Sequence, residues 1–233
     1  LAAMIRHRSH NAPGHILTIE DPIEFLFPHD KSIVDQREVG IDTLSFGEAL
    51  RNAMREAPDV IMLGEIRDHE TAQHAIAYAE TGHLCISTLH ANNASQTIER
   101  MFNFFPEEAH NRVLQDLALN LKGVISQRLI PAINQKRALA VEIMLQTPFL
   151  SDLIQRGRLN DVKEEMGKAN EEGMVTFDQS LFALYQAGRV SQDVAIAHAD
   201  SPTNLALKMR LSVRHTTDDA PPLTMQDMGE RRL

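Results

Sequence analysis

The first ninety residues alternate between short, continuously apolar stretches and longer amphipathic ones. Continuous apolar runs predict buried strands, and they occupy residues 15–19, 59–63 and 84–88. Apolar residues spaced three and four apart predict helices over residues 1–11, 45–56 and 69–82, and from about residue 94. Strands without polar positions that alternate with helices are typical of a mostly parallel sheet covered on both faces. The pattern therefore predicts an α/β fold.

Local signals mark the ends of several helices. Ser45 begins a capping-box pattern, and Asn93 stands at the cap position of the helix that follows it. Gly82 closes the alanine-rich helix. Pro106, followed by two glutamates, predicts the start of a longer helix that reaches about Gln127, because proline suits the first helical position and acids complement the helix dipole.

The remaining patterns are weaker. Residues 31–39 alternate only weakly and predict an edge strand or one arm of a hairpin, while residues 126–133 and 138–145 predict two paired strands. After residue 146, helical patterns separated by glycines predict a small helical subdomain. We therefore expect a core over residues 1–146, a helical subdomain over residues 147–202, and a C-terminal extension over residues 203–233 that is disordered from about residue 215.

Composition and charge narrow the class of protein. With 233 residues, 43% of them hydrophobic, the chain can bury the core of one α/β domain with a small appendage. The formal net charge of −9 and the lack of a long basic run argue against nucleic acid as a substrate. Cys85 is the single cysteine, which excludes an internal disulfide framework and fits a reducing, cytoplasmic compartment. No apolar segment approaches the roughly 18 residues that a membrane helix needs.

Three polar clusters directly follow predicted strands, at residues 20–24, 64–68 and 88–93. Ligands of parallel sheets bind at the carboxyl ends of the strands, so we expect the clusters to converge on one crevice. An acid beside a second acidic cluster is typical of phosphate chemistry, in which one carboxylate holds Mg²⁺ through water and another orients the attacking water. Glu65 alone would be interpreted as a helix cap or a surface charge. It is the three clusters together that favour catalysis.

The spacing of the histidines tests for a metal site. His69 and His74 lie one residue further apart than in the zinc-protease pattern HExxH, so on a helix they point about 140° apart and the metalloprotease interpretation fails. His90 follows a strand and would enter the same crevice as Glu65, which favours a phosphate or nucleotide contact. His83 lies at the end of a predicted helix, where the dipole favours a histidine.

Three segments resemble the motifs of a known family. Residues 54–68, MREAPDVIMLGEIRD, resemble the signature of the type II/IV secretion ATPase superfamily. Residues 16–25, ILTIEDPIEF, with the later QREVG, resemble its Asp box, and residues 81–94, TGHLCISTLHANNA, resemble its His box. The similarity extends to about Pro202, and within the superfamily the chain is similar to the type IV pilus retraction motors, PilT and PilU. Residues 149–156 are FLSDLIQR where PilT-like motors carry AIRNLIRE, which favours the PilU branch.

The resemblance implies a RecA-like P-loop ATPase core with ATP and Mg²⁺ as its cofactors. It implies that Glu24 is the base that polarises the lytic water. Glu65 would be the Walker B carboxylate that holds Mg²⁺, directly or through water. His83 and His90 would sense the γ-phosphate and couple the state of ATP to contacts between subunits.

Further roles and partners are also implied by the resemblance. Arg67 would contact phosphate or form a salt bridge across subunits. Glu20 and Asp21 would support the metal or position the base, unless they serve only in capping and loop hydrogen bonds. The implied assembly is a homohexamer that powers pilus retraction and twitching motility, in the cytoplasm at the inner-membrane base of the pilus machine. Its implied partners are a PilT-like motor and the platform protein of the inner membrane.

One family motif does not occur in the chain. The phosphate-binding loop, GxxxxGK followed by Ser or Thr, is absent, and the chain opens at Leu1 inside a predicted helix. We therefore expect a fragment that lacks the first strand, the loop and an N-terminal domain, and that alone hydrolyses ATP scarcely at all. The alternative is a truncated, non-catalytic interaction subunit or a pseudogene remnant. A third interpretation, a secretion or assembly ATPase, predicts a tetracysteine zinc insertion, against which the single cysteine argues.

Overall fold

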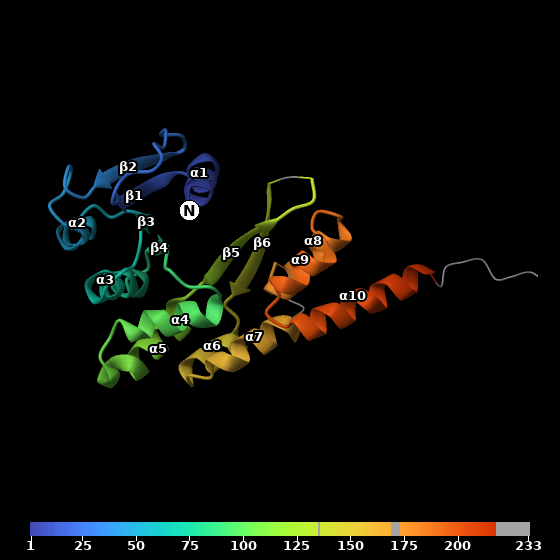
Figure 1. The fold of residues 1–233 in the computed structure, drawn as a ribbon. Coiled ribbons are helices and arrows are strands. Elements are labelled where there is room, and N and C mark those ends of the chain that lie inside the picture. The colour runs from blue at the N-terminus through green and yellow to red at the C-terminus, as the bar shows by residue number, and fades with distance from the viewer. Residues whose placement is uncertain (135, 169–172, 218–233) are drawn as a thin grey trace, which may run out of the picture. The chain divides into compact units, whose positions relative to one another are not determined.

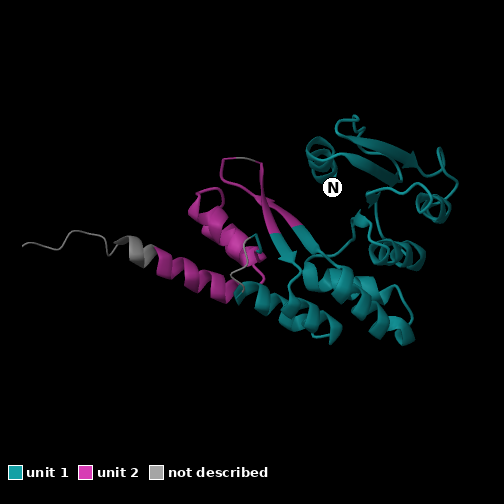
Figure 2. Cartoon of the chain, turned by 180° about the vertical axis from the view of Figure 1, so that it is seen from behind, with its two compact units in different colours: residues 1–126, 142–174 teal, residues 127–141, 175–233 magenta. Residues whose placement is uncertain are grey.

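The computed structural model describes residues 1–134, 136–168 and 173–217. The chain forms two compact units, coloured separately in Figure 2: residues 1–126 with 142–174, and residues 127–141 with 175–233. The division runs through two paired strands, β5 (Gly123–Pro131) and β6 (Arg137–Leu145), which confirm the predicted pairing. It does not coincide with the domain boundaries that the sequence predicts after residues 146 and 202, which remain predictions.

The first unit is built on a parallel sheet (Figure 1). Its four strands lie in the order β2-β1-β3-β4 and are β1 (Gly14–Glu20), β2 (Ser32–Glu38), β3 (Val60–Leu63) and β4 (Leu84–Ser87). Each strand pairs in parallel with its neighbours. Residues 31–39 therefore contain the edge strand that was one of the two expectations. The hairpin alternative is wrong, because the arms of a hairpin run in opposite directions.

Helices cover both faces of this sheet. One face packs against α1 (Ala2–Asn11), whose Ile5 lies in a cluster with Ile16, Val34, Val60 and Met62. The alternate residues of the same strands belong to a second cluster that includes α2 (Phe46–Ala53) and α3 (His69–Glu80), and they are Leu17, Ile19, Ile61 and Leu63. Successive side chains of a strand point to opposite faces, so burial on both sides requires continuous apolar runs. The predicted α/β fold is confirmed.

Side chains hold α2 and α3 in place. The Ser45 side chain accepts a backbone N–H of the first turn of α2, as predicted, and Asp68 caps α3 in the same way. The Tyr78 hydroxyl donates a hydrogen bond to the Leu50 carbonyl and so fastens α3 to α2. Gly82 takes a φ of +92° after the end of α3, a conformation that glycine adopts without strain. The predicted bounds of these helices are correct to within three residues.

One predicted helix is shorter than expected. After α4 (Ala94–Asn103), a single 3₁₀ turn over Glu107–Ala109 leads into α5 (His110–Asn120). The prediction that this helix reaches Gln127 is wrong. Beyond Lys122 the side chains alternate between exposed and buried, which is the period of a strand, and β5 begins at Gly123.

The described helices after β6 divide between the two units. They are α6 (Pro148–Gln155), α7 (Leu159–Lys168), α8 (Phe177–Gln186), α9 (Gln192–Ala197) and α10 (Pro202–Thr217). α6 and α7 pack into the core of the first unit, whereas α8, α9 and α10 build the core of the second around Phe177, Leu181 and Leu205. α10 extends two residues past the predicted start of disorder, and residues 218–233 lie outside the described part. None of the described helices is long and apolar enough to cross a bilayer.

Candidate active site at the carboxyl edge of the sheet

Three loops meet where the parallel strands end. Ile19 of β1 pairs with Leu63 of β3, which pairs with Ser87 of β4, so the strands end at the same level. The Thr88 hydroxyl donates to the Gly64 carbonyl at 2.6 Å, and the Ile66 N–H donates to the Thr88 carbonyl at 2.9 Å. These two bonds join the loop after β3 to the loop after β4. The sequence clusters at residues 64–68 and 88–93 are thus adjacent in space.

The two loops bring Glu65 and His90 into contact. Glu65 Oε1 lies 3.1 Å from His90 Nε2, and the side chains are 35% and 80% exposed. The four residues of β3 before them, Val60 to Leu63, are all buried and fix the position from which the loop departs. A partly exposed carboxylate beside an exposed imidazole can bind a cation and a phosphate oxygen together. This pair is the centre of the candidate site.

Arg67 connects the loop after β3 to the loop after β1. Its Nη2 lies 2.8 Å from Asp21 Oδ2, and its guanidinium lies 5.3 Å from the centre of the Phe46 ring. The hydrogen bond with Asp21 raises the pKa of the guanidinium, which is charged at all relevant pH values. Within the described chain Arg67 therefore forms an intramolecular ion pair. Its implied contacts with phosphate or with another subunit stay predictions.

The two remaining acids of the Asp box differ in exposure. Glu20 is 6% exposed, and its Oε1 accepts hydrogen bonds from the Thr18 hydroxyl at 2.8 Å and from Gln36 Nε2 at 3.1 Å. It points to one face of the sheet rather than beyond its edge. Glu24 is exposed, and its side chain has no hydrogen bond or ion pair with the described residues. Of the two, only Glu24 is open to a substrate.

His83 lies at the amino-terminal end of β4, whereas His90 follows the carboxyl-terminal end. Four residues at about 3.3 Å each put roughly 13 Å between the two ends of this strand. The His83 Nδ1 lies 3.0 Å from the Thr81 hydroxyl, and its ring makes an edge contact with Tyr78. The structure therefore does not bring His83 to the Glu65 and His90 pair.

The donor set suits a loosely held cation. No group of three or more His, Cys, Asp or Glu side chains that could hold a metal occurs within the described ranges. Mg²⁺ is usually bound by one or two carboxylates together with waters and substrate phosphates, and Glu65 offers one such carboxylate. Cys85 packs against the core, and burial raises the pKa of its thiol to about 12, so it is not a thiolate nucleophile at neutral pH.

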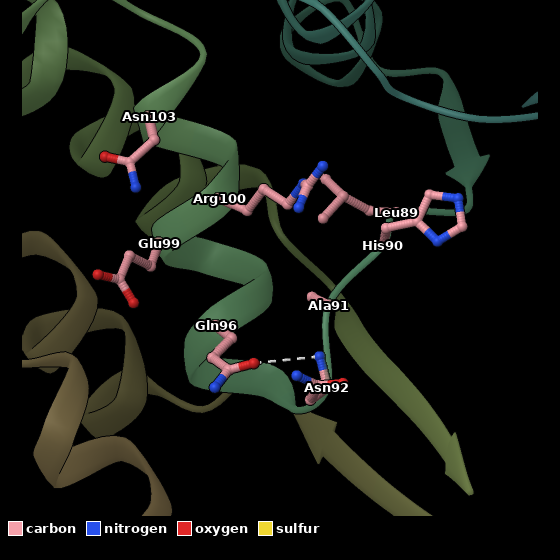
Figure 3. A pocket seen from close by; sticks show the side chains of 8 residues that line it. All are labelled: Leu89, His90, Ala91, Asn92, Gln96, Glu99, Arg100 and Asn103. Carbon is pink, nitrogen blue, oxygen red and sulfur yellow. Dashed lines mark hydrogen bonds between the residues drawn. The ribbon is translucent and has the colours of Figure 1, made fainter.

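A pocket opens beside His90 (Figure 3). It has a volume of about 480 Å³, and its walls include Leu89, His90, Asn92, Gln96, Arg100 and Asn103. Figure 3 shows the Arg100 side chain extending from α4 toward Leu89 and His90. Arg100 forms no ion pair with another described residue. Arg100 was not predicted from the sequence, because an arginine on an amphipathic helix is ordinarily a solvated charge.

Comparison with known proteins identifies the family to which this chain is related. Residues 2–188 match the sequence family described as type II/IV secretion system protein. The type IV pilus ATPase PilU of Pseudomonas aeruginosa is 50% identical over 96% of this chain, which spans 59% of that protein.

Solved structures agree with this sequence match. A crystal structure of the pilus retraction motor PilT with bound ADP has a TM-score of 0.80 and 43% identity, over 87% of this chain and 57% of that one. The ATPase DotB of Legionella pneumophila has a TM-score of 0.75 and 28% identity, over 85% and 56%. The sheet and its helices have the predicted RecA-like fold. The chain belongs to the type II/IV secretion system protein family.

Proposed function

We propose that this chain is the C-terminal ATPase part of a motor subunit that powers type IV pilus retraction. One observation carries the proposal: Glu65 and His90 are in contact at the carboxyl edge of the sheet, 3.1 Å apart, next to the loop that holds the exposed Glu24. The similarity to PilU and PilT, whose names describe pilus ATPases, supports the reaction. The ADP bound in the similar PilT structure supports nucleotide binding.

The acids divide the work of hydrolysis between them. Glu24 has no hydrogen bond or ion pair with the described residues, and it takes a proton from the attacking water as general base. Glu65 holds Mg²⁺, directly or through water, and when bound this ion neutralises developing charge on the phosphates. Asp21, through Arg67, keeps the loop of Glu24 near the loop of Glu65. Glu20 is linked to the loop of Glu24 through Gln36, whose Nε2 donates to both Glu20 Oε1 and the Phe25 carbonyl.

The histidines serve different contacts. His90, beside Glu65 and largely exposed, senses the γ-phosphate. His83 lies at the amino-terminal end of β4, away from Glu65 and His90. This position favours a contact with a neighbouring subunit over direct sensing of the γ-phosphate.

The proposed assembly is a homohexamer with ATP between subunits, in the cytoplasm at the inner-membrane base of the pilus machine. Its partners are a PilT-like motor and the platform protein of the inner membrane. The chain spans 59% of the PilU relative, and the proposed activity and partners concern the complete protein.

Glu24→Gln in the complete protein tests the proposal. Removing a general base costs on the order of 100-fold to 10,000-fold in rate, so we expect turnover to fall by at least 100-fold while ATP binding changes little. Phosphate release measures turnover, and a fluorescent ATP analogue measures binding. Asp35→Asn is the control, because this residue contacts His15 on β1 and not the site. Unchanged turnover in Glu24→Gln would refute the assignment.

A further inference from the structure

The loop that carries Glu24 has almost no backbone structure of its own. Residues 21–29 make no backbone-to-backbone hydrogen bond with the described residues, and only Asp30 and Lys31 do so as the chain enters β2. Glu24 itself is exposed and has no described side-chain partner. Something other than the loop's own backbone must therefore determine where its carboxylate points.

Two side chains of β2 hold this loop on both sides of Glu24. The Ile23 N–H, just before Glu24, donates to Glu38 Oε2 at 3.0 Å. After Glu24, Gln36 uses both ends of its amide: its Nε2 donates to the Phe25 carbonyl at 2.8 Å, and its Oε1 accepts the Phe27 N–H at 2.8 Å. The three bonds replace the regular hydrogen bonds that the loop lacks.

The parallel register explains why these two residues reach the loop. Gln36 pairs with Thr18, and Glu38 pairs with Glu20, so residues two apart on each strand project from the same face of the sheet. The Nε2 of Gln36 also lies 3.1 Å from Glu20 Oε1, which ties the amide to the buried acid.

The far end of the loop is anchored by apolar contact. Phe27 packs against the cluster of α1 and the sheet that contains Ile5, Ile16 and Val34. Phe25 and Leu26 remain 63% and 85% exposed. Residues 23–27 are therefore held by the polar side chains of β2 and, at Phe27, by apolar contact.

We propose that Gln36 and Glu38 are positioning residues for ATP hydrolysis, because they fix the backbone on both sides of the catalytic carboxylate of Glu24. This proposal rests on the proposed function of Glu24 as the base. A general base must reach its water to within about 2.6–3.2 Å. A misplacement of about 1 Å can cost on the order of 100-fold in rate. Loss of either side chain should therefore lower turnover and leave nucleotide binding unchanged, because neither residue contacts the nucleotide.

The test compares Gln36→Met and Glu38→Ala with Glu38→Gln in the complete protein. Met keeps the volume of Gln36 but none of its hydrogen bonds, whereas Gln at position 38 keeps an acceptor for the Ile23 N–H. We expect the first two variants to lower kcat by about 10-fold to 100-fold, with KM for ATP within about twofold. Glu38→Gln should restore most of the rate. Asp35→Ala, on the same strand, should leave kcat unchanged.

Hydrogen exchange supplies the readout that activity alone cannot. In Gln36→Met and Glu38→Ala, peptides covering residues 21–29 should exchange at least tenfold faster than in the wild type, while β3 and β4 keep their protection. In the Glu24→Gln background, Gln36→Met should lower kcat no further, since both changes act through the same carboxylate.

The outcomes separate the two proposals. Faster exchange with unchanged kcat, or a rise in KM with kcat preserved, would overturn the positioning role while leaving Glu24 as the base. If Glu38→Ala does not fold, an unchanged rate in the folded Gln36→Met variant is sufficient to overturn it. Unchanged turnover in Glu24→Gln would instead remove the proposed function itself.

Discussion

Three glutamates near the carboxyl edge of the sheet lie in different surroundings. Glu20 is buried and accepts two hydrogen bonds, Glu65 is partly exposed beside His90, and Glu24 is exposed without a described partner. The motifs assign a different role to each glutamate from its position in the sequence. The solvent exposure of each side chain now gives a physical reason for that difference. A buried acid with two donors organises its surroundings, whereas an exposed one is available to a substrate.

His90→Ala should separate a functional histidine from a structural one. The side chain is 80% exposed, so its removal should change the free energy of unfolding by less than about 0.5 kcal/mol. We expect ATP hydrolysis by the complete protein to fall at least tenfold, because the γ-phosphate loses a donor. Thermal unfolding and phosphate release measure the two effects. A folded variant with unchanged hydrolysis would contradict the role of His90 as a phosphate contact.

Gly64→Ala tests whether the glycine is needed for the fold or for a ligand. A Cβ at this position would lie 3.5 Å from the Glu20 Cα and from the Ile19 carbonyl oxygen, which is ordinary contact, and the residue does not have a positive φ. The fold alone therefore does not require glycine here. We expect the free energy of unfolding, measured with urea, to change by no more than about 0.5 kcal/mol.

The same variant should weaken ATP binding by the complete protein, if the backbone of this loop approaches the nucleotide closely. Weakened folding with normal ATP binding would contradict this interpretation. Gly167→Ala provides a matched control, since a Cβ at that glycine meets no atom within 4 Å.

Among the elements, α3 shows how a helix cap fixes a loop of the site. The Asp68 side chain accepts the Thr71 N–H at 2.8 Å, and this bond lowers the pKa of the Asp68 carboxyl. The cap directly follows Arg67, so it determines where the loop after β3 ends. The site loop thus spans only Gly64 to Arg67 between a buried strand and a capped helix.

Asp68→Ala should lower the free energy of unfolding by about 1 kcal/mol at neutral pH. Because the pKa is lowered in the folded state, the stabilisation is complete above the unfolded pKa of about 3.9 and is lost as the pH falls through the folded pKa. Urea unfolding at several pH values measures the gap between wild type and variant. Asp68→Asn, which keeps an acceptor but does not titrate, should show little loss at neutral pH. A gap that does not shrink as the pH falls below the unfolded pKa would contradict the assignment.

The periodicity of apolar residues was sufficient to predict some helices and strands but not others. The strands of the sheet and helices α1 to α4 were predictable, because burial on one or two faces leaves a local pattern. The end of α5 was not, since the residues after Asn120 fit a helical pattern until their pairing in β5 selects the strand period. The direction of β2 was also unpredictable, because it depends on its partner β1.

At the scale of the whole molecule, the 233 residues supply carboxylates and histidines but no phosphate-binding loop. We expect this chain alone to bind ATP weakly and to hydrolyse it scarcely at all, because the backbone N–H groups and lysine of such a loop form the main cradle for the β- and γ-phosphates. Phosphate release by the chain, compared with its Glu65→Gln variant and with the complete protein, measures this. Turnover equal to that of the complete protein would show that the loop is dispensable.

The sequence by itself determined the period of each element, the residues able to do phosphate chemistry, and the family through its long motifs. These are local properties of neighbouring residues. Only the tertiary structure decided that Arg67 pairs with Asp21, that Glu20 is buried, and that β2 holds the loop of Glu24. Each of these depends on strand order and register, which bring together residues far apart in the chain and leave no periodic signal in either segment.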